Sequence, residues 1–287
     1  MEKESPSSAY VLNSESQTEM DRLIKQGRMI TQAMGGPLSG IPDPSRLKNI
    51  LDLCCGPGGW TLEVASALPD VKVEGVDISH LMVDHANTQA RAQQLSNVTF
   101  RVMNITQPLA IPDASFDLIN ARLLVGVLKR DMWASFLREC TRILRPGGLL
   151  RLTEPTDTGH TSSAAANQIG ALIMQALWKA GYGFSPDGRT FGVSHILPSL
   201  LREQKYRQIQ LFAYALEGSA KLEAWADSYH DIKTLGLQMK PLFIKLGLIT
   251  DETFDQLYQQ ALADMQRDEF CGMGYFLTVL GQKPAES

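Results

Sequence analysis

The sequence predicts an α/β fold: a Rossmann-like, doubly wound, mostly parallel sheet of seven strands, with an N-terminal helical extension and a helical lid inserted before the last strand. Three observations support this prediction. From residue 49 onwards, short apolar runs alternate with amphipathic helical segments, a pattern typical of parallel sheets with right-handed crossovers. A glycine-rich turn follows the first apolar run. The second half instead holds a long helical stretch between two strand-like runs.

The elements are expected in the following order. A first helix should carry the apolar stripe Met20, Leu23, Ile24 and Ile30. Apolar or alternating runs then predict strands at 49–54, 72–78, 98–103, 116–121, 149–154, 206–215 and 275–281. Helical spacing predicts helices at 58–68, from 79, from 131, at 164–180 and in two stretches before the last strand.

Three regions follow from this order. Residues 1–46 form an N-terminal extension with its helix, and its Ser-rich first 16 residues are expected to be mobile. Residues 47–217 together with 273–287 form the Rossmann-like core, and residues 218–272 form a helical cap inserted into it. A glycine-rich loop at 181–192 precedes the cap, and a loop of this kind next to a helical insertion suggests a lid.

Bulk properties exclude several classes of protein. A net charge of −4 without a lysine or arginine run disfavours a nucleic-acid partner. The four cysteines lack zinc-binding spacing, so no metal site and reduced, buried thiols are expected. No signal-like segment and no apolar run of about 20 residues is present, so we expect no membrane span and a cytoplasmic location. The sequence leaves a homodimer open.

The most informative segment runs from Asp52 to Trp60, where a strand enters a glycine turn that opens a helix. Glycines such as Gly56 allow a sharp turn and close approach of a ligand, and the helix start offers free N–H groups. Asp77 ends the second strand, where an acid can accept hydrogen bonds from ribose hydroxyls. Asn104 follows the third strand, at the height of an adenine edge. Each residue alone could be structural, but together they predict a nucleoside-type cofactor.

Two departures from the dinucleotide fingerprint argue against NAD. That fingerprint places glycine or alanine where this chain has Thr61. Asp52 also stands inside the first strand, where a dinucleotide enzyme usually has an apolar residue.

Five segments together resemble the motifs of class I S-adenosylmethionine-dependent methyltransferases. They are LDLCCGPGGW, VEGVDIS, VMNI, PDASFDLINARLL and LRPGGLLRLTE, within residues 47–154. The chain looks most similar to small-molecule enzymes of the ubiquinone/menaquinone type and to natural-product tailoring enzymes. The resemblance implies S-adenosyl-L-methionine as cofactor and S-adenosyl-L-homocysteine as its product.

The resemblance also implies roles for individual residues. Asp77 would hold the ribose, and Asn104 and Ile105 the adenine edge, although many relatives have Asp in place of Asn104. Val127-Leu128 stands where many relatives carry a His-Leu pair, so that histidine is not available as a base. The full set of expected cofactor contacts is Tyr10, Cys54, Gly56, Gly58, Asp77, Ile78, Met82, Asn104, Ile105 and Ala121.

Methyl transfer from a sulfonium is an in-line displacement, so a dedicated base is optional. Glu154, Asp157 and His160, at the end of the fifth strand and just after it, are candidate catalytic residues. Arg122 could orient an acidic acceptor, and His195 could close over the site from the glycine-rich loop. For each of them a solvated or structural role is the alternative. The expected reaction is methyl transfer to a small, fairly apolar acceptor resembling a quinone or a natural product.

Other functions stay open at this point. A nucleic-acid or protein methyltransferase is one, but Asn120-Ala121-Arg122-Leu123 replaces the N/D-P-P-Y/F motif of amino-methylating enzymes. The Pro-Cys nucleophile of cytosine-C5 enzymes is also absent. A non-catalytic cofactor-binding module and an NAD-dependent oxidoreductase are the remaining alternatives, to be separated by turnover and binding measurements.

Overall fold

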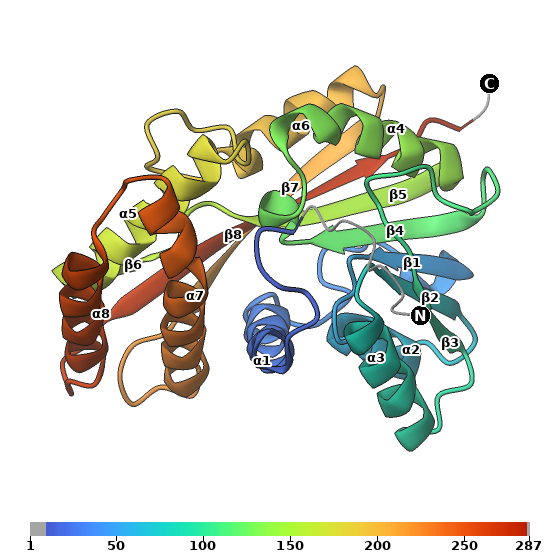
Figure 1. Cartoon of the computed structure of the whole chain (residues 1–287). Coiled ribbons are helices and arrows are strands. Elements are labelled where there is room, and N and C mark those ends of the chain that lie inside the picture. Colours follow the sequence, from blue (N-terminus) through green and yellow to red (C-terminus); the bar gives the residue numbers. More distant parts are fainter. Residues whose placement is uncertain (1–9, 286–287) are drawn as a thin grey trace, which may run out of the picture.

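The computed structural model describes residues 10–285 and has a central sheet of eight strands (Figure 1). The strands are β1 (Asn49–Leu53), β2 (Lys72–Asp77), β3 (Val98–Val102), β4 (Phe116–Arg122), β5 (Leu144–Pro155), β6 (His160–Thr161), β7 (Arg207–Glu217) and β8 (Gly272–Gln282). Their order is β3-β2-β1-β4-β5-β8-β6, and β7 also pairs with β8. β1 to β5 are parallel, whereas β8 runs antiparallel to its three neighbours.

The sheet has one strand more than the sequence predicts. β8 extends beyond the end of β5, and its first residues, Gly272 and Met273, pair with Thr161 and His160 of β6. A two-residue strand has no alternating pattern of its own, so it could not be recognised from the sequence.

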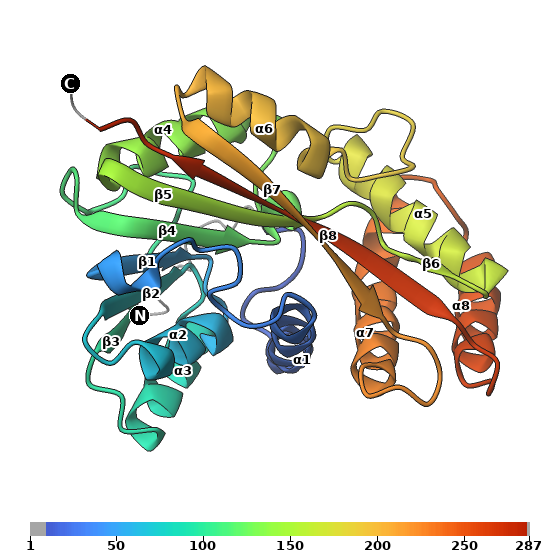
Figure 2. The same ribbon diagram turned by 180° about the vertical axis from the view of Figure 1, so that it is seen from behind.

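Helices cover both faces of the sheet. They are α1 (Gln17–Ala33), α2 (Gly59–Ala67), α3 (His80–Ala92), α4 (Trp133–Ile143), α5 (Ala164–Lys179), α6 (Val193–Glu203), α7 (Trp225–Lys245) and α8 (Asp251–Met265). Figures 1 and 2 show α1, α2 and α3 on one face and α4 and α6 on the other. None of the helices between residues 10 and 285 combines the length and the apolar character that a bilayer span requires.

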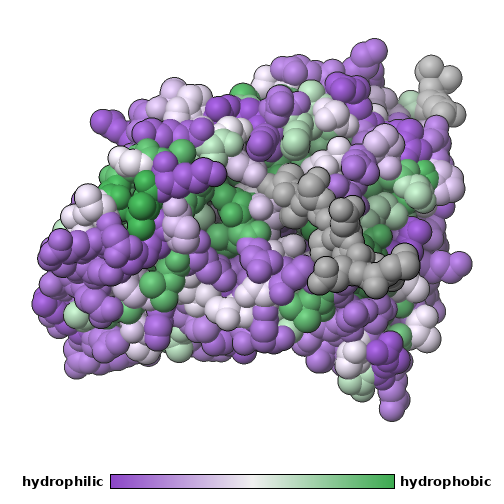
Figure 3. All heavy atoms as spheres, viewed as in Figure 1, coloured by the Kyte–Doolittle hydropathy of each residue, from purple (hydrophilic) through white to green (hydrophobic). Residues whose placement is uncertain are grey.

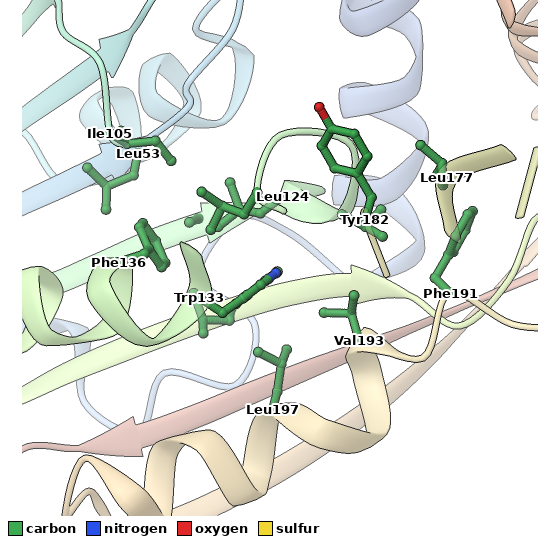
Figure 4. Close-up of a cluster of buried hydrophobic side chains, with 14 of the residues drawn as sticks. Leu53, Ile105, Leu124, Trp133, Phe136, Leu177, Tyr182, Phe191, Val193 and Leu197 are labelled. Carbon is green, nitrogen blue, oxygen red and sulfur yellow. The ribbon is translucent and has the colours of Figure 1, made fainter. Parts of the chain in front are cut away.

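Alternating side chains of the strands divide the core into two clusters. On β1, Leu51 and Leu53 belong to the cluster under α4 and α6, whereas Ile50 belongs to the cluster under α2 and α3. Figure 4 shows Trp133 of α4 and Leu197 of α6 gathered in the first cluster. Because both faces of the central strands are buried, these strands appear in the sequence as near-continuous apolar runs.

The remaining helices form a cap at one end of the sheet. α7 and α8 lie between β7 and β8 in the chain, inside the segment 218–272 assigned to the cap from the sequence. α5, assigned to the core from the sequence, packs against both of them. Phe254 and Tyr258 of α8 are buried in this packing, and Phe254 also lies against Phe243 of α7. Figure 1 shows these three helices side by side, beyond the parallel strands.

Candidate active site

A cavity of about 320 Å³ opens at the carboxyl ends of β1, β2 and β4, where doubly wound sheets bind their ligands. Its lining comes from the glycine turn after β1, the ends of β2 and β3, helix α1 and the cap helices α5 and α7. Apolar side chains are visible in the middle of the corresponding face, between the cap and the core (Figure 3). The cavity therefore joins the predicted cofactor motifs to the cap.

The turn after β1 depends on left-handed backbone. Gly56 has φ +54, and its ideal Cβ would lie 3.8 Å from Leu23 Cδ1 of α1. Cys54 also has a positive φ, of 55°, although it carries a side chain, and burial raises the pKa of its thiol. Glycine is needed at position 58 for packing, because a Cβ there would lie only 2.8 Å from Ala86 Cβ. Its absence lets α2 begin close to α3. Gly58 does not line the cavity.

Asp77 links the end of β2 to this turn. Its Oδ2 accepts a hydrogen bond from the Gly56 N–H at 2.9 Å, and its Oδ1 accepts one from the Ser79 N–H at 3.0 Å. Burial raises the pKa of the Asp77 carboxyl, against the lowering effect of these N–H donors. The residue lines the cavity together with Ile78 and Met82.

The segment after β3 supplies the next wall, with Met103, Asn104 and Ile105. The Asn104 Oδ1 accepts hydrogen bonds from the N–H and the hydroxyl of Thr106, at 2.9 and 2.8 Å. Within residues 10–285 its amide nitrogen donates no hydrogen bond. That group is therefore a donor suited to a ring nitrogen, whereas an aspartate at this position would offer only acceptors.

The residues before α1 cross the cavity and are fixed at both ends. The Val11 N–H donates to the Gly126 carbonyl at 3.0 Å, and the Tyr10 hydroxyl donates to Glu19 Oε1 at 2.5 Å. The Glu15 carboxylate accepts from the N–H groups of His80 and Leu81 at the start of α3. Tyr10 and Val11 thus line the cavity next to the loop that follows β4.

Helix α1 is joined to the cap by a buried ion pair. Arg22 Nη1 lies 2.6 Å from Asp231 Oδ1 of α7, and Arg22 also holds Glu19 through two hydrogen bonds. Gln26 donates to the same Asp231 carboxylate. Arg28 and Asp227 pair further along the same two helices. These contacts fix the cap over the polar part of the cavity.

The opposite part of the cavity is apolar. It lies between α5 and α7, and its walls include Ile169, Ile173, Leu177, Phe191, Ile232, Leu235 and Met239. The aromatic pair Trp225 and Tyr229 instead stack on each other, with ring centroids 5.5 Å apart, outside this lining.

Three of the five candidate catalytic residues do not line the cavity. The Glu154 carboxylate is buried and accepts the N–H groups of Leu124 and Val125 at 2.7 and 3.1 Å, so it holds the loop after β4. His160 is exposed, with Nε2 3.5 Å from Asp157 Oδ2, and His195 is exposed on α6. Their geometry supports no role in the reaction. A chain position just after a strand does not fix the side on which the side chain emerges.

The other two candidates, Arg122 and Asp157, line the cavity. Of the expected cofactor contacts, Tyr10, Cys54, Gly56, Asp77, Ile78, Met82, Asn104 and Ile105 also line it. Ala121, in contrast, is a fully buried residue of β4 and does not line the cavity.

Sequence reasoning missed Arg22, Gln26 and the walls of α5 and α7. These residues reach the cavity through packing between helices that are far apart in the chain.

A buried polar network explains why an acid stands inside β1. Asp52 accepts hydrogen bonds from the Thr61 hydroxyl at 2.6 Å and from the Asn120 amide at 2.8 Å. Asn120 in turn accepts from Arg151 at 3.0 Å. Thr61, which breaks the dinucleotide fingerprint, therefore ties α2 to β1. Among the described residues, no cluster of side chains could hold a metal ion.

The strand order, the glycine turn after β1 and the acid at the end of β2 agree with a Rossmann-like methyltransferase fold. Residues 50–148 match the family described as a methyltransferase domain. The chain therefore carries a methyltransferase domain.

The relatives include small-molecule enzymes. A demethylmenaquinone methyltransferase of Lactococcus lactis is 26% identical over 226 residues, which are 78% of this chain and 72% of that protein. The aklanonic acid methyltransferase DauC of a Streptomyces species is 30% identical over 145 residues, 50% of this chain and 64% of its own length. Among solved structures, the YcgJ protein of Bacillus subtilis has a TM-score of 0.54 at 18% identity, covering 91% of this chain and 99% of its own. That likeness shows a shared fold.

Proposed function

We propose that this chain binds S-adenosylmethionine in the cavity and transfers its methyl group to a small, fairly apolar acceptor held between α5 and α7. One observation carries the proposal: a single cavity joins polar strand ends suited to a nucleoside to apolar walls supplied by the cap. A fold alone does not define a reaction, so the argument rests on this site.

The residues present fit the cofactor. Asp77 keeps free lone pairs on both carboxylate oxygens and would accept the ribose hydroxyls. The Asn104 amide would donate to a ring nitrogen of adenine, and the open turn at Gly56 leaves room for the methionine chain. When bound, the cofactor supplies an electrophilic methyl group on a sulfonium.

The protein itself would position the reactants and exclude water. The segment at Tyr10 and Val11 lines the cavity beside Gly126, and the Arg22–Asp231 pair joins α1 to the cap. Alignment of the reactants alone can lower the barrier substantially, which makes a dedicated base optional. Where an acceptor needs to lose a proton, Asp157 is a carboxylate in the cavity lining, and its Oδ1 is held by the Gly159 N–H at 2.7 Å.

The acceptor class follows from the apolar walls and from the names of the relatives. Ile173 of α5 and Leu235 of α7 offer no hydrogen bonds, so shape and apolar burial would select the acceptor. Demethylmenaquinone and aklanonic acid, the compounds in two relatives' names, are the first acceptors to test.

Calorimetry with S-adenosylhomocysteine and with NADH tests the cofactor. Binding of the first alone is expected, and binding of NADH alone would favour an oxidoreductase. Transfer of labelled methyl from S-adenosylmethionine to the two acceptors, with nucleic acid and protein as comparison substrates, tests the reaction. Cofactor binding without transfer to any of them would favour a non-catalytic module, and transfer to a polymer would contradict the small-molecule acceptor.

A further inference from the structure

Arg122 is a partly buried cation, and residues 10–285 offer it no carboxylate within ion-pair distance. It ends β4, its side chain lines the cavity, and its Nη1 donates to the Thr31 hydroxyl of α1 at 3.0 Å. Within residues 10–285 it forms no ion pair, and burial lowers its pKa, while Asp52 and Glu63 raise it from a longer distance. A guanidinium in this setting loses hydration that nothing in the protein fully replaces.

The nearest buried acid cannot serve as its partner. Asp52 is held by the Thr61 hydroxyl and the Asn120 amide, and it also faces a second buried arginine, Arg151. Repulsion from Arg122 contributes to lowering the pKa of Arg151 to about 10. An anion bound beside Arg122 would therefore supply the missing partner and would also reduce the repulsion between Arg122 and Arg151.

Arg122 and Asp77 stand on opposite sides of the glycine turn. Leu53 of β1 pairs with Val76 on one side and with Ala121 on the other. The residues that follow, Asp77 and Arg122, are thus each one strand spacing from Cys54, or roughly 10 Å apart at ~4.8 Å per strand. A methionine chain that leaves a ribose bound at Asp77 and crosses the turn is long enough to approach Arg122.

One face of α1 covers the same path. Leu23 lies beside Gly56, and a Cβ on Gly27 would lie 3.8 Å from Arg122 Nη2. Thr31 is one further turn along and holds the guanidinium. Spacing by four residues places all three on one side of the helix. The residues around Arg122 come from the elements that surround the glycine turn: Gly27 and Thr31 from α1, Asp52 from β1 and Glu63 from α2.

We propose that Arg122 binds the carboxylate of the cofactor's methionine chain, rather than an acidic acceptor. This inference rests on the proposed function. A carboxylate supplies the charge and the two oxygens that a guanidinium binds most strongly. Because Arg122 is partly buried, the contact should contribute substantially to affinity.

Two ligands that differ in the amino-acid part test the assignment. S-Adenosylhomocysteine carries the carboxylate, whereas 5′-methylthioadenosine has the same nucleoside and sulfur without it. Calorimetry on Arg122→Met is expected to show tenfold or greater weakening for S-adenosylhomocysteine and a change within twofold for 5′-methylthioadenosine. Arg122→Lys should recover part of the loss, because it restores the charge without the planar pair of donors. Retained 5′-methylthioadenosine binding shows that the variant is folded; should Arg122→Met fail to fold, Arg122→Gln repeats the comparison.

The results separate this inference from the proposed function. If the wild-type chain binds S-adenosylhomocysteine and Arg122→Met binds it equally well, the inference is wrong and the proposed function stands. Equal loss for both ligands would also overturn it, since the effect would not depend on the carboxylate. If the wild-type chain binds neither ligand, both proposals fail.

Discussion

Asp77 Oδ2 lies 2.9 Å from the backbone nitrogen of Gly56, so the acid at the end of β2 holds the turn at the end of β1. The other oxygen, Oδ1, accepts from the Ser79 N–H at the start of α3. Each carboxylate oxygen has lone pairs to spare. One side chain thus fixes the geometry of the turn and remains able to accept hydrogen bonds from a ligand.

Asp77→Ala is expected to weaken S-adenosylhomocysteine binding tenfold or more, since it removes the ribose acceptor and frees the turn; each decade corresponds to about 1.4 kcal/mol. Calorimetry measures the dissociation constant directly. Glu74→Ala is a matched control on the same strand, because Glu74 pairs with Arg101 at the surface. The affinity of this variant for S-adenosylhomocysteine should stay within twofold of the wild-type value. An unchanged affinity for Asp77→Ala would remove this residue from the binding site.

The apolar wall of α7 allows a test on the acceptor side. Leu235→Trp would fill part of the cavity, whereas Leu237→Trp on the same helix would extend into solvent from a residue that is 47% exposed. We expect the first variant to lower kcat/KM for an acceptor at least tenfold with S-adenosylhomocysteine affinity within twofold, and the second to change neither. Initial-rate measurements over acceptor concentration give the comparison. Equal rates in both variants would place the acceptor elsewhere.

The Arg22–Asp231 pair joins two helices that are 209 residues apart in sequence. Asp231→Asn should lower the free energy of unfolding by about 1–3 kcal/mol, because a charged hydrogen bond in a largely buried setting is weakened. Hydrogen exchange of the α7 amides should also become faster. Asp255→Asn, which removes a surface partner of Lys240, is the control and should cost about 0–1 kcal/mol. Identical exchange of α7 in the two variants would show that the pair does not hold the cap.

Glu154 predicts a pH dependence of stability. Burial raises the pKa of its carboxyl from an ordinary value of 4.5 to about 8. Between these values the folded state keeps a proton that the unfolded state has lost. The stability that this bound proton provides is therefore fully present below pH 4.5. As the pH rises from 4.5 to about 8, the free energy of unfolding falls by about 3–5 kcal/mol.

Glu154→Gln removes this titration. It also loses one acceptor for the Leu124 and Val125 N–H groups, which lowers stability by a constant amount. Denaturant unfolding at several pH values gives the free energy of unfolding of both proteins. The wild-type value minus the variant value should fall steadily from pH 5 to 8. A difference that is independent of pH would show that Glu154 is ionised throughout this range.

Much of the parallel half of the fold could be predicted because its signals are local. The strand from Asn49 and the glycine turn were evident from apolar runs and from the glycines themselves. Asp77 and Asn104 could be named because the carboxyl ends of parallel strands meet at one edge of the sheet. Glu154 and His160 show the limit of that reasoning, because a position near the edge does not determine which way a side chain turns.

By itself, the sequence determined the order of the five parallel strands and of the helices between them, the turn after β1 and the residues at the ends of β2 and β3, because short-range periodicity and backbone preferences encode them. Only the tertiary structure decided that α1 meets α7, that α5 joins the cap, and that Arg122 lines the cavity while it is hydrogen-bonded to Thr31. Those features arise from the packing of distant segments. Such packing depends on how well the surfaces of distant segments fit together, and a local sequence pattern does not specify this fit.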